Sequence, residues 1–156
     1  MIRSILRRIF SDNKVIKSTL LHTYNNNEHS VTIDGVKIFL DKHDSLSLHL
    51  CPYEPIQLEW IKNHIMPGDI VLDVGANIGY YTMMLAKAVG PTGRVYSFEP
   101  EPNNFNLIQK NMLANHYTNV YPVNAAVGKS NGSLKLYISK PEWNGSNGMH
   151  RVYPSI

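Results

Sequence analysis

The spacing of hydrophobic residues predicts a β-hairpin and then a helix in the first part of the chain. Two runs rich in β-branched residues, 31–33 and 36–40, flank Asp34-Gly35, a dipeptide that favours the positive φ angles of a tight hairpin turn. Within residues 53–65, apolar side chains recur at helical spacing behind Pro55, which suits a first helical turn. The residues of that apolar stripe are Leu58, Ile61 and Ile65.

From Asp69 onward, short apolar runs alternate with helical patterns, which is typical of an α/β fold with a parallel sheet. We expect strands at 70–74, 94–99 and 119–124, and helices over 78–89 and 102–112. The side chains predicted to face inward from these helices are Ile78, Tyr81, Leu85, Val89, Phe105, Ile108 and Met112.

The composition of each strand predicts its place in the sheet. Residues 70–74 are nearly all apolar, as in a central strand that is covered on both faces. Pro122 cannot donate a hydrogen bond to a neighbouring strand, so the 119–124 strand is expected at an edge. Alternation at 134–138 predicts one more strand that folds back antiparallel, whereas residues 141–156 show no period and are predicted to be a loop.

Length and charge exclude several classes of protein. The 156 residues, 43% of them hydrophobic, fit one folded domain. Residues 1–17 hold five basic groups and one acid, and the other 139 residues have a net charge of −1, which disfavours nucleic-acid binding. No apolar run reaches the length of a transmembrane helix, and the single Cys51 allows no intrachain disulfide and no cysteine-based metal site. We therefore expect a cytoplasmic protein without a metal.

The basic N-terminal segment has two interpretations. Its apolar residues, Ile2, Ile5, Leu6 and Ile9, recur at helical spacing with arginines between them. Such a pattern is typical of a short helix that packs on the domain, and also of a helix that lies on an anionic membrane surface. Both interpretations of residues 1–17 stay open at this point.

The residues after the first parallel strand predict a ligand-binding turn. Asp73 ends that strand, and Gly75, Ala76, Asn77 and Gly79 form the turn that leads into a helix. Glycine lets the main chain approach a ligand closely, and the first amides of a helix favour an anionic group. Because a buried Asp73 carboxylate needs a cationic partner or N–H donors, we expect a ligand with both a carboxylate and an ammonium group.

A second acid defines the rest of that ligand. Glu99 ends the second parallel strand, at the place where an acid in a βαβ unit accepts hydrogen bonds from ribose hydroxyls. An amino acid joined to a nucleoside describes S-adenosylmethionine. A dinucleotide site would need G-x-G-x-x-G, and here Asp73 stands at the first glycine position, so a nicotinamide cofactor is disfavoured.

At these residues the sequence resembles class I methyltransferases, and most closely the FkbM family. The likeness lies in residues 71–82, 93–100 and 124–128, with Tyr53-Glu-Pro55 and Pro67-Gly68 upstream. It implies a Rossmann-like sheet, S-adenosylmethionine as cofactor, and O-methylation of a hydroxyl on a sugar, glycan or natural product. The cofactor-binding residues that it implies are Asp73, Gly75, Ala76, Asn77 and Gly79 at the methionine end, Glu99 at the ribose, and Asn124 beside the adenine.

The sequence departs from the family after about residue 128. FkbM-like proteins continue with a strand that ends in a Lys-Ile-Asp-Val-Glu-Gly-like motif and with further helices and strands, and this motif is absent here. The predicted organisation is an N-terminal helix and hairpin over 1–52, the cofactor-binding half of a methyltransferase domain over 53–140, and a tail over 141–156. In the strand order of the family, residues 70–74 would then form an open apolar edge.

Two functions therefore stay in view. One is a methyltransferase, or the cofactor half of one in a longer natural protein. The other is a truncated product that binds the cofactor without turnover or pairs with another chain. The sequence does not identify a catalytic base, because five residues are equally eligible: His43, His49, His64, His116 and Glu54. Tyr53 and Glu54 are the better candidates for pocket lining, although Glu54 could instead cap a helix.

Overall fold

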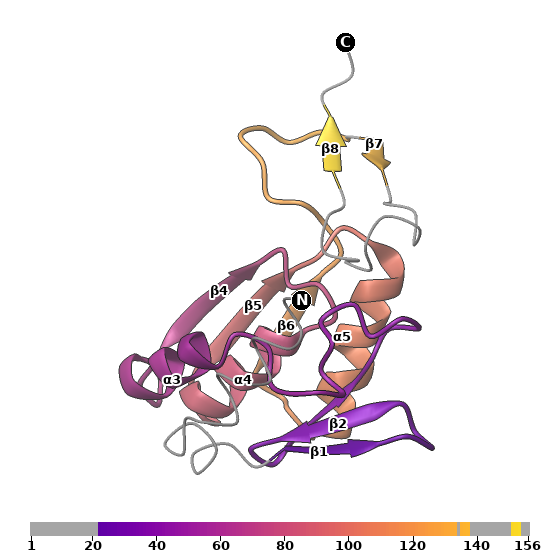
Figure 1. The fold of residues 1–156 in the computed structure, drawn as a ribbon. Coiled ribbons are helices and arrows are strands. Elements are labelled where there is room, and N and C mark those ends of the chain that lie inside the picture. Colours follow the sequence, from indigo (N-terminus) through magenta and orange to yellow (C-terminus); the bar gives the residue numbers. More distant parts are fainter. Residues whose placement is uncertain (1–21, 134, 138–150, 154–156) are drawn as a thin grey trace.

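The computed structural model describes residues 22–133, 135–137 and 151–153, and it confirms the α/β class (Figure 1). The predicted segment 1–17 lies outside the described residues. No helix within the described ranges is long and apolar enough to cross a membrane. The helices and strands of the described residues are β1 (His22–Asn25), β2 (Ser30–Ile33), β3 (Val36–Phe39), α3 (Pro55–His64), β4 (Ile70–Val74), α4 (Tyr80–Val89), β5 (Arg94–Phe98), α5 (Pro102–Ala114), β6 (Val120–Val123), β7 (Lys135–Tyr137) and β8 (Arg151–Tyr153).

Two helices lie between two sheets (Figure 1). The parallel sheet has the order β4-β5-β6, with α4 packed on β4 and β5 and α5 packed on β6. The antiparallel sheet β1-β2-β3 covers the helices from the other side, because β3 contacts both α4 and α5. Both helices therefore share one face of the parallel sheet.

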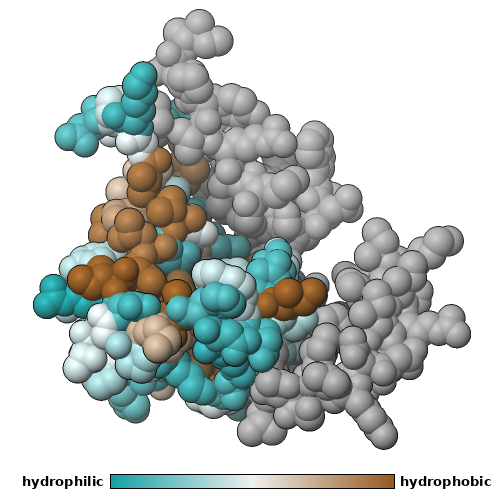
Figure 2. All heavy atoms as spheres, turned by 90° about the vertical axis from the view of Figure 1, so that its left-hand side faces the viewer, coloured by the Kyte–Doolittle hydropathy of each residue, from teal (hydrophilic) through white to brown (hydrophobic). Residues whose placement is uncertain are grey.

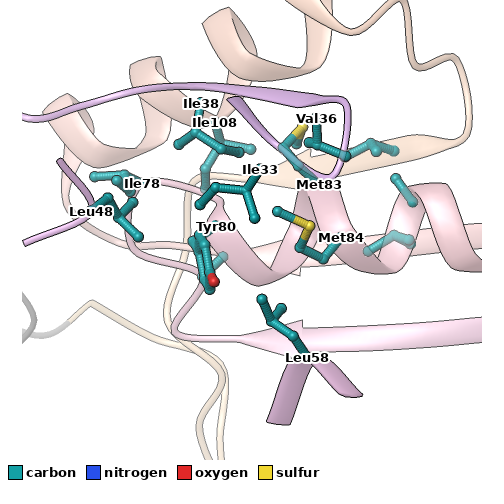
Figure 3. Packing of buried hydrophobic residues seen from close by; sticks show 14 of the residues in the cluster. Ile33, Val36, Ile38, Leu48, Leu58, Ile78, Tyr80, Met83, Met84 and Ile108 are labelled. Atoms are coloured by element: carbon teal, nitrogen blue, oxygen red, sulfur yellow. The ribbon is translucent and has the colours of Figure 1, made fainter. Parts of the chain in front are cut away.

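The core fills the space between the antiparallel sheet and the helices (Figure 3). Ile33, Val36 and Ile38 of the predicted hairpin pack toward Met83 of α4 and Ile108 of α5, and each of the five is at most 1% exposed. The hairpin turn was predicted correctly, since its two central residues have φ angles of 53° and 78°. β1 was not predicted, because the asparagines that follow it made this stretch read as a polar loop.

The buried side of α4 differs from the predicted one. The helix begins at Tyr80 rather than at residue 78, because Gly79 adopts a left-handed φ of 84° and forms the N-cap. Val89 is buried, as predicted. Tyr81 and Leu85 were also predicted to face inward, but they are only partly buried. Sheets cover α4 on two sides, and its buried residues are accordingly spread more widely: Tyr80, Thr82, Met83, Met84, Ala86 and Val89.

Asparagine side chains join α5 to the edge of β3. Asn111 is fully buried, and its Oδ1 accepts a hydrogen bond from the backbone amide of Phe39 at 2.7 Å. Its Nδ2 donates to the carbonyl oxygen of Ile78 at 2.8 Å. One turn later, Asn115 bonds both the amide and the carbonyl of Lys37, at 2.8 and 2.7 Å. These bonds fix the hairpin on the helices, whereas the sequence pattern predicted only apolar residues on this face of α5.

Two predictions about the C-terminal part need correction. The added antiparallel strand exists as β7, but it pairs with β8 in a separate two-stranded sheet rather than with the parallel sheet. Residues 141–156 are consequently not loop throughout, because 151–153 form β8. Residues 151–153 form a strand through their pairing with β7. The sequence around β8 has too few alternating apolar and polar positions to predict a strand.

The prediction that β4 is covered on both faces was wrong. Ile70, Leu72 and Val74 are 66%, 67% and 59% exposed. The two edge predictions were correct, because β4 and β6 are the outer strands of the parallel sheet. On one face of β4, Val71 packs against the core beside α4, whereas Ile70, Leu72 and Val74 on the other face are not covered by any described element.

Candidate functional site

The turn from β4 into α4 lies at the carboxyl ends of the parallel strands, where ligands bind in open α/β sheets. The backbone amides of Gly75 and Ala76 both donate to the carbonyl oxygen of Phe98 in β5, at 2.9 and 3.0 Å. Gly75, Asn77 and Gly79 have positive φ angles of 80°, 53° and 84°. These contacts and angles hold residues 75–79 as a tight loop against the neighbouring strand.

The Asp73 side chain meets the first turn of α4. Its Oδ2 accepts a hydrogen bond from the Thr82 hydroxyl at 2.5 Å. Burial raises the pKa of Asp73, and hydrogen bonds from the Thr82 side chain and backbone offset part of this rise. Asp73 was predicted to be a site residue, whereas Thr82 was not singled out, although it lies only three residues after Gly79 in the sequence.

Glu99 lies directly after β5, is only 5% exposed, and is bonded to both flanking loops. Its Oε2 accepts a hydrogen bond from the Asn77 amide at 2.7 Å, and its Oε1 accepts one from the Glu101 amide at 2.9 Å. The carboxylate thus faces the glycine loop, which is compatible with the predicted ribose role of Glu99. The same bonds show that Glu99 also shapes the loop, a task that the sequence did not reveal.

The two glycines of the loop meet different surroundings. A Cβ atom added to Gly75 would find no atom within 4 Å, so the main chain at Gly75 faces open space. A Cβ atom added to Gly79 would lie 3.1 Å from Cγ1 and 3.3 Å from Cα of Ile108. Gly79 therefore allows α5 to pack closely, while Gly75 leaves room for a ligand beside the loop.

Two asparagines complete the site. The Oδ1 atom of Asn77 is buried and has no hydrogen-bond partner among the described residues. An unpartnered buried acceptor is costly, and a donor group on a ligand would satisfy it. Asn124, just after β6, donates from Nδ2 to the carbonyl oxygen of Glu99 at 2.8 Å. The predicted site residues therefore gather at one edge of the sheet, at the ends of three adjacent strands.

Comparison with known proteins identifies the family. The model of the methyltransferase FkbM domain matches residues 73–152, just over half of the chain. The chain belongs to the FkbM methyltransferase family. The cofactor of these class I methyltransferases is S-adenosylmethionine. The open space at Gly75 and the unpartnered acceptor at Asn77 fit a bound ligand of this kind.

Individual relatives are similar over shorter stretches. A protein-L-isoaspartate O-methyltransferase of Caenorhabditis elegans is 37% identical over 59 residues, 38% of this chain and 26% of the relative. Methyltransferase 1 of Beauveria bassiana is 27% identical over 104 residues, 60% of this chain and 41% of the relative. The chain thus spans well under half of the length of these curated relatives.

A solved structure shares the fold. A Pyrococcus horikoshii protein, described as a transferase, has a TM-score of 0.51 at 19% identity, over 69% of this chain and 37% of the other. At this identity the likeness concerns the fold alone. The likeness extends beyond the glycine loop, since it covers 69% of this chain.

Tyrosines link the FkbM glycine loop to the start of α3. The Tyr80 hydroxyl donates to the carbonyl oxygen of Tyr53 at 2.8 Å, and the Tyr81 hydroxyl donates to Oε2 of Glu54 at 2.5 Å. Glu54 is the N-cap residue of α3, but its side chain makes no capping hydrogen bond. Glu54 thus stands at the capping position without a capping hydrogen bond from its side chain, which contacts Tyr81 in the first turn of α4 instead. Burial and the Glu54 carboxylate raise the pKa of Tyr81.

The candidate histidines lie in different places. His64 is the last residue of α3, and His116 follows α5. Both lie at the end of the sheet opposite to the glycine loop, because each precedes the start of a parallel strand. His43 is exposed. His49 pairs through Nδ1 with the carboxylate of Asp44, which is only 6% exposed. Of the four, His49 is the one with a carboxylate that fixes its tautomer.

Proposed function

We propose that the chain binds S-adenosylmethionine between Asp73 and Glu99, and that the protein transfers its methyl group to a hydroxyl. The observation that carries the proposal is the joint placement of two buried or half-buried acids at the ends of adjacent strands, with the loop 75–79 bonded between them. The bound cofactor supplies an electrophilic methyl group. Family membership supports the choice of this cofactor over a dinucleotide.

Each site residue has a distinct task in this proposal. The Asp73 carboxylate pairs with the ammonium of the methionine end, which compensates the cost of its burial. The main chain at Gly75 and Ala76 leaves room beside the carboxylate of the ligand. Glu99 accepts hydrogen bonds from the ribose hydroxyls, and Asn124 lies on the adenine side.

The acceptor is proposed from the family resemblance. We expect the acceptor to be a hydroxyl on a small molecule or glycan, and we expect no nucleic-acid partner. The protein is expected to act in the cytoplasm. The relatives' names state other acceptors, protein L-isoaspartate in one and tRNA adenine in another, so the fold by itself does not select one. The alternative is binding of the cofactor without turnover.

Calorimetric titration tests the cofactor site. S-adenosylhomocysteine and its 2′-deoxyribose analogue are titrated into the chain, into Glu99→Gln and into Glu59→Gln, whose acid is exposed on α3. We expect the chain and Glu59→Gln to prefer the ribose form by about tenfold, as one hydrogen bond to a charged group predicts. In Glu99→Gln this preference disappears. If Glu99→Gln keeps the preference and loses only overall affinity, Glu99 holds the loop and does not bind ribose.

Turnover requires a separate measurement. Release of S-adenosylhomocysteine from S-adenosylmethionine is followed with sugar and small hydroxyl acceptors. Acceptor-dependent release supports methyl transfer. Saturable binding without release under any acceptor supports the alternative of a cofactor-binding chain without turnover.

A further inference from the structure

Glu54 is an acid that the proposed cofactor site does not use. Its Oε2 accepts a hydrogen bond from the Tyr81 hydroxyl at 2.5 Å. The next residue along α4, Thr82, donates from its own hydroxyl to the carboxylate of Asp73. Two acids from different elements are therefore bonded to adjacent residues in the first turn of α4, directly after the glycine loop.

The backbone of Glu54 is strained. Its φ of 44° and ψ of 62° lie in the left-handed region, which residues other than glycine rarely adopt. A helix N-cap usually has an extended backbone and bonds the first amides of the helix with its side chain, and Glu54 does neither. Two tyrosine bonds hold this conformation, from Tyr81 to Glu54 and from Tyr80 to the carbonyl oxygen of Tyr53. Strain of this kind is typical of functional sites.

The tyrosines around Glu54 keep their protons. Burial raises the pKa of Tyr80 and of Tyr81, and the hydrogen bond to Glu54 raises that of Tyr81 further. Burial and the Glu54 carboxylate likewise raise the pKa of Tyr53. The negative charge of this group of residues therefore lies on Glu54, at the N-terminus of α3, where the helix dipole favours it. Among these four side chains, Glu54 is the one suited to accept a proton.

Glu54 also lies on the side from which an acceptor reaches the proposed cofactor. In that binding mode, adenine and ribose lie at the ends of β6 and β5, and the methionine end lies at β4. α5 packs on β6, whereas α3 packs on α4, on the side of α4 that faces away from α5 (Figure 1). The ligand itself thus occupies the β5 and β6 side, and the side of β4 and α3 is left for the acceptor.

Hydrophobic side chains surround this approach. Figure 2 shows the side of the molecule that carries β4 and α3, and hydrophobic residues gather there. Ile56, two residues after Glu54, is 75% exposed. An acceptor bound beside Glu54 therefore also covers apolar surface. Such cover excludes water from the carboxylate and strengthens its interaction with the acceptor hydroxyl.

The histidines that were candidate bases lie elsewhere. His64 and His116 are at the opposite end of the sheet. The ring of His49 contacts Tyr24 of β1, with centroids 6.0 Å apart, so it lies toward the antiparallel sheet. His43 is exposed in the loop after β3. Within the described ranges, the acid before α3 is the candidate whose side chain is bonded to the first turn of α4.

We propose that Glu54 is the general base of the methyl transfer, an inference that rests on the proposed function. The carboxylate takes the proton of the acceptor hydroxyl while the hydroxyl oxygen bonds to the methyl carbon. The bond between methyl and sulfur breaks, and its electron pair stays on the sulfur of S-adenosylhomocysteine. Tyr81 positions the carboxylate, which faces the transferable methyl across the acceptor oxygen.

Ligand binding tests this placement without an acceptor. Sinefungin carries an ammonium group where the cofactor carries its methyl, and S-adenosylhomocysteine carries neither. Both are titrated by calorimetry into the chain, into Glu54→Gln and into Glu59→Gln, whose acid is exposed on α3. We expect the chain and Glu59→Gln to prefer sinefungin by about tenfold, as a hydrogen bond between charged groups predicts. Glu54→Gln should lose this preference and keep its affinity for S-adenosylhomocysteine.

A second variant separates positioning from folding. Tyr81→Phe removes the hydroxyl that holds Glu54 and leaves the carboxylate in place, so it should reduce the sinefungin preference without abolishing it. Thermal melts show whether each variant is folded. With a hydroxyl acceptor that supports turnover, Glu54→Gln should lower kcat by about a hundredfold or more and leave the KM for S-adenosylmethionine unchanged.

Three outcomes overturn the assignment. One is a sinefungin preference that persists in Glu54→Gln, and another is the absence of that preference in the unchanged chain. The third is an equal loss of affinity for both ligands in Glu54→Gln, which would place Glu54 at the methionine end or in the fold alone. If the unchanged chain binds no S-adenosylhomocysteine, the proposed function itself fails. Binding with the ribose preference intact leaves that function standing when the Glu54 assignment fails.

Discussion

The backbone amide of Asn77 donates a 2.7 Å hydrogen bond to Oε2 of Glu99, although 22 residues separate them in the sequence. This bond joins the glycine loop after β4 to the acid after β5. Because the other carboxylate oxygen accepts from the Glu101 amide, Glu99 also holds the start of α5. The geometry of the glycine loop and the position of Glu99, the proposed ribose ligand, are therefore coupled.

Removal of the Glu99 carboxylate is expected to destabilise the fold as well as the site. Glu99→Ala leaves two backbone amides without their charged acceptor, at about 1.5–3 kcal/mol for each bond. Glu99→Gln retains one acceptor oxygen and is expected to lose about half as much. Urea unfolding measures both. Equal stability of Glu99→Ala and the unchanged chain would show that these bonds contribute nothing.

Neutralisation of Asp73 is expected to weaken binding and stabilise the empty protein. In the folded state the pKa of Asp73 is raised above its ordinary value of 3.8, mainly by burial. The folded state therefore favours the protonated carboxyl, and the stability this provides is present below about pH 3.8 and lost as pH rises through the raised pKa. Asp73→Asn is permanently neutral and should unfold at a higher temperature than the unchanged chain at pH 7.

The same variant should bind S-adenosylhomocysteine about 10- to 150-fold more weakly, which corresponds to one charge-assisted hydrogen bond of about 1.5–3 kcal/mol. Thermal melts at pH 7 and pH 3 and a calorimetric titration at pH 7 give the two readouts. The melting difference should vanish at pH 3. If Asp73→Asn is destabilised at pH 7, burial does not disfavour the ionised Asp73 carboxylate as argued here.

The two loop glycines should respond differently to alanine. Gly79→Ala combines a φ of 84° with a close approach to the backbone of Ile108, and is expected to cost about 2–4 kcal/mol of stability. Gly75→Ala has a similar φ of 80° but no neighbour within 4 Å, and is expected to cost about 1–2 kcal/mol. If Gly75 faces the ligand, Gly75→Ala should nevertheless lose the larger share of cofactor affinity. Urea unfolding and calorimetry on both variants separate these effects.

The order of elements could be predicted because periods of two and 3.6 residues differ clearly along this chain. The turn at Asp34-Gly35 and the edge position of β6, which contains Pro122, followed from backbone chemistry in the same way. The buried side of α4 could not be predicted well, because the antiparallel sheet that covers the helix lies far away in the sequence. A hydrophobic stripe describes a helix that packs on one side, and α4 packs on two.

The positions of the candidate site residues could be predicted in outline for a similar reason. Asp73 and Glu99 stand at strand ends, and strand ends are visible in the sequence. The bonds from Asn77 to Glu99 and from Thr82 to Asp73 depend on how the loop closes, which no local pattern encodes. The hydrogen bond from Tyr81 to Glu54 joins residues that are 27 positions apart, and it could not be predicted from the sequence either.

Asn111 illustrates how such long-range polar contacts support the site. Asn111→Ala would leave the Phe39 amide and the Ile78 carbonyl without their partner in the core, at an expected cost of about 2–4 kcal/mol. Asn106→Ala on the exposed side of α5 is the matched control and should change stability by less than about 0.5 kcal/mol. Because Ile78 lies between Asn77 and Gly79, Asn111→Ala should also weaken cofactor binding. Unchanged affinity in a destabilised but folded variant would show that the loop keeps its shape without this bond.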